Sequence, residues 1–200
     1  KGPTAMSNTL ILASTSKYRG ALLARICKDF TQQAPICDET PAGDPTPAAL
    51  AKRLARTKAA SISSQNPEAM VIGSDQVASL SGVILGKPGD HANAVKQLRA
   101  CSGLNVNFYT AVCIRRESDN TEHMHIDHTR VCFKTLSPAL IENYLQAEKP
   151  YDCAGSFKSE GLGVVLFDHI DSVDPTALIG LPLIWVADAL MQSGVKLLSS

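Results

Sequence analysis

The chain has 200 residues, 44% of them hydrophobic, and its 19 basic residues balance its 19 acidic residues. This length fits one large domain or two small lobes with a sizeable core. A neutral chain gives no support for broad binding to nucleic acid or to an anionic membrane surface, although it leaves room for a local pocket that binds one small anion. No apolar run approaches the ~20 residues of a membrane-spanning helix.

The N-terminus and the cysteines favour a cytoplasmic protein. Residues 1–9 lack the hydrophobic region of a signal peptide, and we expect them to be a disordered N-terminus or a remnant of cloning, with Met6 as the natural start. The six cysteines form no Cys-x-x-Cys pair, and several lie in apolar patterns, where cysteine behaves as a small hydrophobic residue. We therefore expect a reduced protein in which residues 10–198 form a single domain.

The first elements of the chain alternate between strand and helix. Residues 9–13 predict an apolar strand, and the hydroxyl-rich turn after it leads into a helix whose predicted N-cap is Ser16. Free backbone N–H groups and the helix dipole favour an anion at such a turn, where Ser14 and Arg19 would add side-chain contacts. The turn lacks the GxxxxGK[ST] pattern of a Walker P-loop, and an N-cap beside a surface arginine explains it nearly as well.

A polar, proline-rich connection over residues 33–47 joins this helix to the next and contains the acidic pair Asp38 and Glu39. Connections of this length are often functional, and two adjacent acids either ligate a divalent cation or are simply solvated. The next helix is predicted to begin at Pro47. Its Lys58 lies near the edge of the apolar face, where a lysine either enters a cleft or only follows the surface.

The central stretch of the chain carries an acid and a lysine that suit phosphate chemistry. Residues 70–72 predict a short buried strand that Gly73 breaks, so that Asp75 is presented at a strand end. Further along, a tight turn carries Lys87. A carboxylate can align water or a metal and an ammonium can hold phosphate, although a solvated acid and a turn lysine are an equally good explanation.

The second half of the chain predicts longer strands followed by further helices. Alternating apolar residues indicate two antiparallel strands across a polar turn near Asn120, and Pro138 opens a helix. The predicted strands are 83–85, 106–114, 129–133, 162–167 and 170–173, and the predicted helices are 91–100, 138–145 and 181–191. Together these elements predict an α/β fold in which helices flank a mixed β-sheet, with a central cleft between two lobes.

Three histidines, His123, His125 and His128, cluster with Asp127 close to the polar turn. Residues i and i+2 of a strand share a face, so His123 and His125 are able to bind a metal together. Structural zinc sites usually have four well-spaced ligands, so a polar hairpin is the favoured interpretation.

Several short motifs occur in an order that is typical of one family. They are Ala13-Ser14-Thr15-Ser16 with Tyr18-Arg19, Asp38-Glu39, Lys58-Ala59, Gly73-Ser74-Asp75-Gln76-Val77, Gly86-Lys87-Pro88, Ala154-Gly155-Ser156-Phe157-Lys158-Ser159-Glu160-Gly161 and Gly180-Leu181-Pro182. The set extends from about Leu10 to Leu198. It resembles the Maf family of nucleotide pyrophosphatases, and most of all the subgroup that hydrolyses 7-methyl-GTP.

This resemblance implies a cytoplasmic enzyme with an elongated, Maf/ITPase-like fold that is often dimeric. Such an enzyme splits a nucleoside triphosphate between its α- and β-phosphates with Mg²⁺ or Mn²⁺. The resemblance places the phosphate-binding and catalytic residues at Ser14, Arg19, Glu39, Lys58, Asp75 and Lys87. Asp75 is the candidate that activates water, directly or through the metal, and Glu39 would help to hold the cation.

The resemblance also implies three base-selecting residues, Tyr18, Gln76 and Glu160, where relatives acting on dTTP and UTP typically carry arginine, threonine and glutamine. Tyr18 would stack on the cationic 7-methylguanine. Glu160 would accept hydrogen bonds from the guanine or balance its charge, and Gln76 would bind the base edge.

Three other functions stay open at this stage. The first is a house-cleaning pyrophosphatase for other modified or canonical nucleotides, and the second is a nucleotide-sensing regulator of cell division. The third and weakest is metal storage or a structural role for the histidines. The expected partners are a small nucleotide and a second copy of the chain, with no nucleic acid and no membrane.

Overall fold

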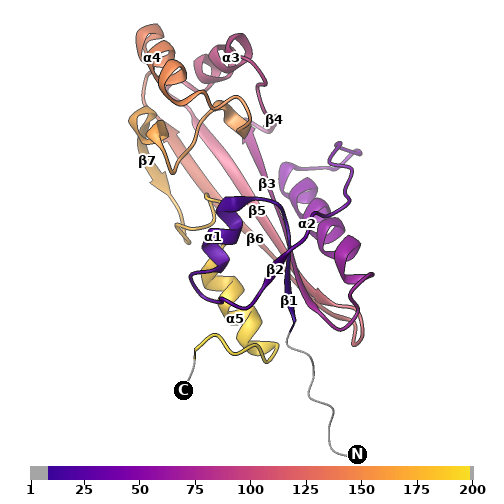
Figure 1. Cartoon of the computed structure of the whole chain (residues 1–200). Helices are drawn as coiled ribbons and strands as arrows, with labels where there is room; N and C mark the ends of the chain where they lie inside the picture. The colour runs from indigo at the N-terminus through magenta and orange to yellow at the C-terminus, as the bar shows by residue number, and fades with distance from the viewer. Residues whose placement is uncertain (1–8, 199–200) are drawn as a thin grey trace, which may run out of the picture.

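A mixed β-sheet of seven strands runs along the length of the molecule (Figure 1). The structure, a computed structural model, describes residues 9–198, so the expectations for residues 1–8 lie outside the described residues. The strands are β1 (Leu10–Ala13), β2 (Thr31–Gln32), β3 (Met70–Leu80), β4 (Val83–Leu85), β5 (Asn105–Arg116), β6 (Thr121–Phe133) and β7 (Phe167–Asp171). Their order across the sheet is β2-β1-β3-β5-β6-β7, and the remaining strand, β4, pairs with β3. β1 is parallel to both of its neighbours, and the other pairs are antiparallel, which confirms the predicted mixed sheet.

Within residues 9–198, five α-helices and two short 3₁₀ helices flank the sheet. They are α1 (Lys17–Leu23), α2 (Pro47–Ser63), α3 (His91–Cys101), α4 (Pro138–Glu148), α5 (Leu183–Gln192), η1 (Ala154–Ser156) and η2 (Leu162–Leu166). Four of the α-helices begin at a capping side chain that accepts a backbone N–H from the first turn; these caps are Ser16, Thr46, Asp90 and Ser137. Each cap satisfies a donor that the helix itself leaves free, so these starts are readable from the sequence.

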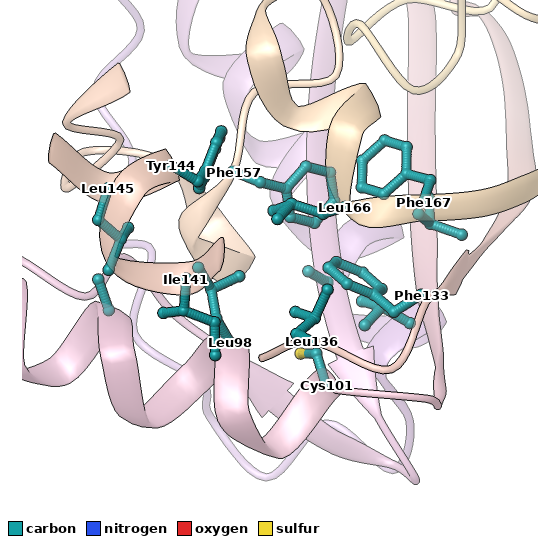
Figure 2. Packing of buried hydrophobic residues seen from close by; sticks show 14 of the residues in the cluster. Leu98, Cys101, Phe133, Leu136, Ile141, Tyr144, Leu145, Phe157, Leu166 and Phe167 are labelled. Carbon is teal, nitrogen blue, oxygen red and sulfur yellow. The ribbon is translucent and has the colours of Figure 1, made fainter. Parts of the chain in front are cut away.

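The sheet has three apolar cores, and their positions define two lobes. Helix α2 covers one face of β1, β3 and β5, and α1 and α5 cover the opposite face. The far ends of β5 and β6 pack with α3, α4 and the segment before β7. Figure 2 shows the aromatic centre of this third core, where Phe157 lies against Phe133 and Phe167. The lobe with α3 and α4 and the lobe with α1, α2 and α5 meet over the middle of β3 (Figure 1).

The prediction that Gly73 breaks a strand is wrong. β3 continues through Gly73 and pairs it with Cys113 of β5. A Cβ atom on Gly73 would lie 2.3 Å from the carbonyl oxygen of Ala55 and 2.6 Å from the backbone nitrogen of Ala59. Glycine is therefore present because α2 packs directly on the strand, and Asp75 projects from the middle of β3 rather than from its end.

The prediction of a strand over residues 162–167 is also wrong for all but its last residue. These residues form η2, because the backbone N–H of Gly163 donates to the carbonyl of Lys158 at 3.0 Å and turns the chain. Of the next predicted strand, 170–173, the first two residues are the end of β7, which begins earlier, at Phe167, and the last two lie outside it. The apolar residues of η2 resemble a strand in sequence, but the two glycines at 161 and 163 favour a turn.

Candidate active site

A buried lysine between two carboxylates forms the centre of the candidate site. The Nζ atom of Lys58 lies 2.7 Å from Oδ1 of Asp75 and 2.6 Å from Oε1 of Glu39. Lys58 and Asp75 are both buried, whereas the Glu39 side chain is 60% exposed. The close packing of α2 on β3 at Gly73 brings Lys58 onto Asp75, because Lys58 lies between the two helix residues that Gly73 contacts, and Asp75 follows Gly73 by two residues on the same face of the strand. Of the two placements left open for Lys58, the structure has the one in a cleft, because Lys58 lines a cavity.

The electrostatics of this triad differ from residue to residue. Burial raises the pKa of Asp75, and the positive charges of Lys58 and Arg19 only partly offset the effect. Burial alone would lower the pKa of Lys58, but Asp75 and Glu39 together outweigh it and raise that pKa. The hydrogen bond from Lys58 lowers the pKa of the more exposed Glu39. The ammonium therefore stays charged, while Asp75 is the carboxylate that takes up a proton more readily.

The first turn of α1 adds an arginine, Arg19, that is fixed by a distant loop. The Nε atom of Arg19 donates to the carbonyl oxygen of Gly180 at 2.8 Å, and the same oxygen accepts the hydroxyl of Ser74 at 2.9 Å. Burial lowers the pKa of Arg19, and the charges of Asp75 and Glu39 oppose this shift. With Nε occupied, the two terminal nitrogens of the guanidinium remain for an anion.

Two cavities lie next to each other along this cleft, and they share Glu39 and Lys87. The first measures about 320 Å³ and the second about 370 Å³. The first is lined by polar and basic groups, among them Ser14, Ser16, Arg19, Glu39, Lys58 and Lys87. The second has a largely apolar lining that includes Leu50, Leu54, Val77, Ile84 and Leu85, with Asp75 and Gln76 beside them.

Six predicted site residues are therefore brought together. Ser14, Arg19, Glu39, Lys58 and Lys87 line the polar cavity, and Asp75 joins them through Lys58. Ser14 is buried, and its hydroxyl accepts the backbone N–H of Ser16 at 3.1 Å, which leaves the hydroxyl proton for another acceptor.

The three residues expected to select the base are more dispersed. Gln76 lines the apolar cavity, but its amide nitrogen donates to Thr110, Ala177 and Leu178 at 3.0–3.1 Å. Tyr18 and Glu160 line neither cavity. The ammonium of Lys17 lies 5.2 Å from the centroid of the Tyr18 ring, so a cation is already near this ring.

Some residues of the site have no clear signal in the sequence. Cys37 lines the polar cavity, and burial raises its pKa despite the nearby Lys58. In the sequence, the one indication that Cys37 lies in the site is its position directly before the acidic pair. Gly180 is different, because its contact with Arg19 spans 161 positions of the chain and no local pattern indicates it.

The histidine cluster brings no three candidate metal-ligand atoms together among the described residues. Within residues 9–198, the only group of three candidate ligand atoms within 4.8 Å of one another is Cys132, His169 and Asp171, and Arg130 forms an ion pair with this aspartate. His125 stacks on Trp185, and His128 stacks on Tyr109. The favoured interpretation of a polar hairpin therefore fits the observed contacts.

Other hollows lie elsewhere on the surface of the described residues. Two larger hollows, of about 580 and 560 Å³, contain none of the predicted site residues. All six cysteines have free thiols in the structure. No helix among the described residues is long and apolar enough to cross a membrane.

The fold and the site together define an α/β protein with a cleft that is lined by three basic side chains and in which a lysine bridges two carboxylates. Residues 9–193 match the family model described as Maf-like protein, and the chain belongs to the Maf family. This confirms the resemblance seen in the sequence.

Curated relatives agree over nearly the whole chain. Several of these relatives are named 7-methyl-GTP pyrophosphatase. The protein from Alcanivorax borkumensis is 46% identical over 97% of this chain and 98% of its own length, and the protein from Polaromonas sp. is 50% identical over 97% of this chain and 89% of its own length. One from Xanthomonas oryzae pv. oryzae is 53% identical over 94% of this chain and 98% of the relative.

Solved structures agree on the fold. A HAM1 protein from Coxiella burnetii aligns with a TM-score of 0.53 at 12% identity, over 92% of this chain and 99% of its own. The Ham1 protein of Staphylococcus aureus aligns with a TM-score of 0.52 at 11% identity, over 94% of this chain and 100% of its own. The predicted elongated α/β fold is confirmed.

Proposed function

We propose that this protein hydrolyses 7-methyl-GTP to the nucleoside monophosphate and pyrophosphate. Its membership of the Maf family and its relatives at 45–53% identity make it a nucleotide pyrophosphatase. The preference for 7-methyl-GTP is the finer part of the proposal and rests on the names of those relatives and on the base-selecting residues. The observation that carries the proposal is the Asp75–Lys58–Glu39 triad at the edge of a cavity lined by Ser14, Arg19 and Lys87.

The polar cavity suits a triphosphate chain. Three cations would offset the charge of the phosphates. They are the guanidinium of Arg19, whose terminal nitrogens remain free of the Gly180 bond, and the ammonium groups of Lys58 and Lys87. The Ser14 hydroxyl and the start of α1 add uncharged donors. The apolar cavity next to it would take the nucleoside, because Leu50, Leu54 and Val77 offer a surface for a ring.

In the proposed reaction, water adds across the α–β phosphoanhydride and its proton passes to Asp75. Pyrophosphate leaves, and the charge that develops on its oxygens is stabilised by the cations already in place. Lys58 holds Asp75 in position through the 2.7 Å hydrogen bond and stays protonated throughout. Burial keeps the carboxylate of Asp75 a better proton acceptor than a solvated one.

We further propose that a divalent cation, Mg²⁺ or Mn²⁺, takes part. The fit is chemical: oxygens of Glu39 and Asp75 converge on one ammonium, and carboxylate oxygens are the ligands that these hard cations prefer. Glu39 and Asp75 would hold the cation. When bound, such a cation supplies charge neutralisation on phosphate oxygens.

The base-selecting trio remains a proposal. Tyr18 has an aromatic face that already attracts the Lys17 ammonium, and 7-methylguanine would offer a cationic ring to the same face. Gln76 has committed its amide nitrogen, so its Oε1 is the atom left to accept a hydrogen bond from the base. Glu160 is exposed, and its carboxylate would balance the charge of the base. We also propose a cytoplasmic location, in keeping with six free thiols, and a homodimer.

The test is pyrophosphate release from 7-methyl-GTP, GTP, UTP, dTTP, CTP and ITP, with Mg²⁺, with Mn²⁺ and with a chelator. We expect 7-methyl-GTP to be turned over best and the chelator to stop the reaction. In the Tyr18→Ala variant we expect the preference for 7-methyl-GTP over GTP to fall by about tenfold, the equivalent of about 1.4 kcal/mol of cation–π attraction. Lys17→Met, which leaves the ring intact, is the matched control.

Other outcomes of this panel are equally clear. Equal turnover of all six nucleotides would replace the preferred substrate with a house-cleaning range. Preference for UTP and dTTP would contradict the role of the trio. No turnover at all, with nucleotide binding retained, would support a sensing protein instead of an enzyme.

The pH dependence of kcat/KM should report Asp75. Protonated Asp75 cannot accept a proton, so kcat/KM should fall as the pH is lowered. Because the pKa of Asp75 is raised, this acidic limb should lie at a higher pH than the ordinary carboxyl pKa. The charge of Glu39 raises the pKa of Asp75, so Glu39→Gln should move the limb of the remaining activity to lower pH. A limb that moves to higher pH in Glu39→Gln would contradict this assignment.

A further inference from the structure

The loop that carries Lys87 has few features of its own that would fix the position of the lysine. Lys87 is exposed and lines both cavities, and no hydrogen bond or ion pair to its ammonium is found among residues 9–198. Gly86 and Gly89 flank the Lys87-Pro88 pair, and Gly89 has a φ of 77°. A loop with two glycines would leave the ammonium widely distributed unless its backbone is held from outside.

The backbone of this loop is held by α3 and by the segment before η2. The carbonyl of Gly86 accepts Nε2 of Gln97 at 3.0 Å and the backbone N–H of Gly155 at 3.4 Å. Asn93 donates to the carbonyl of Pro88 at 3.2 Å. These bonds fasten the residues on both sides of Lys87 to the lobe that contains α3.

Ser156 decides how the Gln97 amide is oriented. Its hydroxyl is fully buried and donates to Oε1 of Gln97 at 2.5 Å, so the amide must turn Nε2 toward Gly86. Ser156 has a φ of 66°, which is unfavourable for a serine, and Gly155 before it has a φ of 77°. Phe157 anchors this unusual backbone in the aromatic core (Figure 2).

We propose that Gln97, oriented by Ser156, is a positioning residue that fixes Lys87 for the triphosphate; this rests on the proposed function. The serine hydroxyl, the glutamine amide and the Gly86 carbonyl form one chain of hydrogen bonds that ends next to Lys87. The long motif around Ser156 thereby gains a role: it supports the lysine loop from behind. A lysine is a point charge on a flexible stem, so a fixed backbone lowers the entropy cost of placing its ammonium.

The test is a double-mutant cycle between Gln97→Met and Lys87→Met, measured as kcat/KM on the best nucleotide. If Gln97 acts through Lys87, Gln97→Met should cost about tenfold alone and nothing further in the Lys87→Met background. In the Lys58→Met background it should still cost about tenfold. Ser156→Ala should act in the same direction, and Arg99→Met, an exposed side chain on the same helix, should change nothing. Independent, additive losses from Gln97→Met and Lys87→Met would overturn the proposal.

Binding of inorganic tripolyphosphate, measured by calorimetry, separates this proposal from the enzymatic one. If the wild type turns over no nucleotide, the proposed function fails, but a non-additive loss of tripolyphosphate affinity in the same cycle still supports the positioning role. An additive loss, or no loss in Gln97→Met at an unchanged melting temperature, overturns it. A wild type that neither hydrolyses nucleotides nor binds tripolyphosphate overturns both.

Discussion

In the Asp75→Asn variant, nucleotide hydrolysis should fall by about 10²–10⁴-fold while the protein stays folded. Asparagine has the shape of aspartate, but its amide cannot take a proton from water. Lys58 keeps Glu39 as its second carboxylate partner, so the buried ammonium is not left alone. The expected cost in stability is therefore the loss of one hydrogen bond to a charged group, about 1.5–3 kcal/mol.

The measurements for this variant are turnover, nucleotide affinity and thermal unfolding. We expect affinity for 7-methyl-GTP to change little in comparison with turnover, because Asp75 acts on the water and the cations bind the phosphates. Asp127→Asn on β6 is the matched control: that aspartate is equally buried, at 7% exposure, but lines neither cavity of the site. Turnover of Asp75→Asn within threefold of wild type would remove Asp75 from the proton-transfer step.

Much of the fold follows from local signals in the chain. The caps at Ser16 and Asp90 mark where two helices begin, and alternation over β5 and β6 predicts the long hairpin that forms. These signals succeed because a cap or an alternating pattern is decided by a few neighbouring residues. For the same reason, Lys58 at the edge of an apolar helix face was a sound candidate.

The parts that were missed depend on contacts between distant segments. Gln76 stays the proposed residue for the base edge, but the sequence does not indicate the three acceptors from β5 and residues 177–178 that hold its amide nitrogen. Ser74 and Arg19 meet on the carbonyl of Gly180, and the short motif that contains this glycine does not indicate either contact. A single sequence cannot show which turn will lie against a strand, so side-chain types were predictable and their partners were not.

Gly73 is the clearest case of a residue whose meaning depends on packing, and Gly73→Ala should strongly destabilise the protein. An added Cβ would lie 2.3 Å from the Ala55 carbonyl oxygen, 2.6 Å from the Ala59 nitrogen and 2.8 Å from the Ala59 Cβ. Two of these contacts are backbone atoms of α2, which cannot move aside as a side chain can. The helix must shift as a unit, and we expect a loss of more than about 3 kcal/mol in the free energy of unfolding.

Replacing glycine by alanine also lowers the conformational entropy of the unfolded chain, and this effect offsets only about 0.4–1 kcal/mol of the cost. Thermal and denaturant unfolding would measure it, with Gly86→Ala as the control, since a Cβ there meets nothing within 4 Å. Ala59→Gly in the same chain should not rescue Gly73→Ala, because the clash with the Ala55 carbonyl remains. Rescue would mean that side chains alone set the distance between helix and strand.

Where the variant still folds, its activity tests how tightly the triad depends on this distance. Lys58 and Asp75 are joined at 2.7 Å across the α2–β3 interface, so a shift of the helix separates them. Hydrolysis should then fall by about 10²-fold or more even in the folded fraction, as expected for a misplacement of about 1 Å. A folded Gly73→Ala protein with wild-type turnover would show that the lysine follows the helix without loss of geometry, and that the glycine serves stability alone.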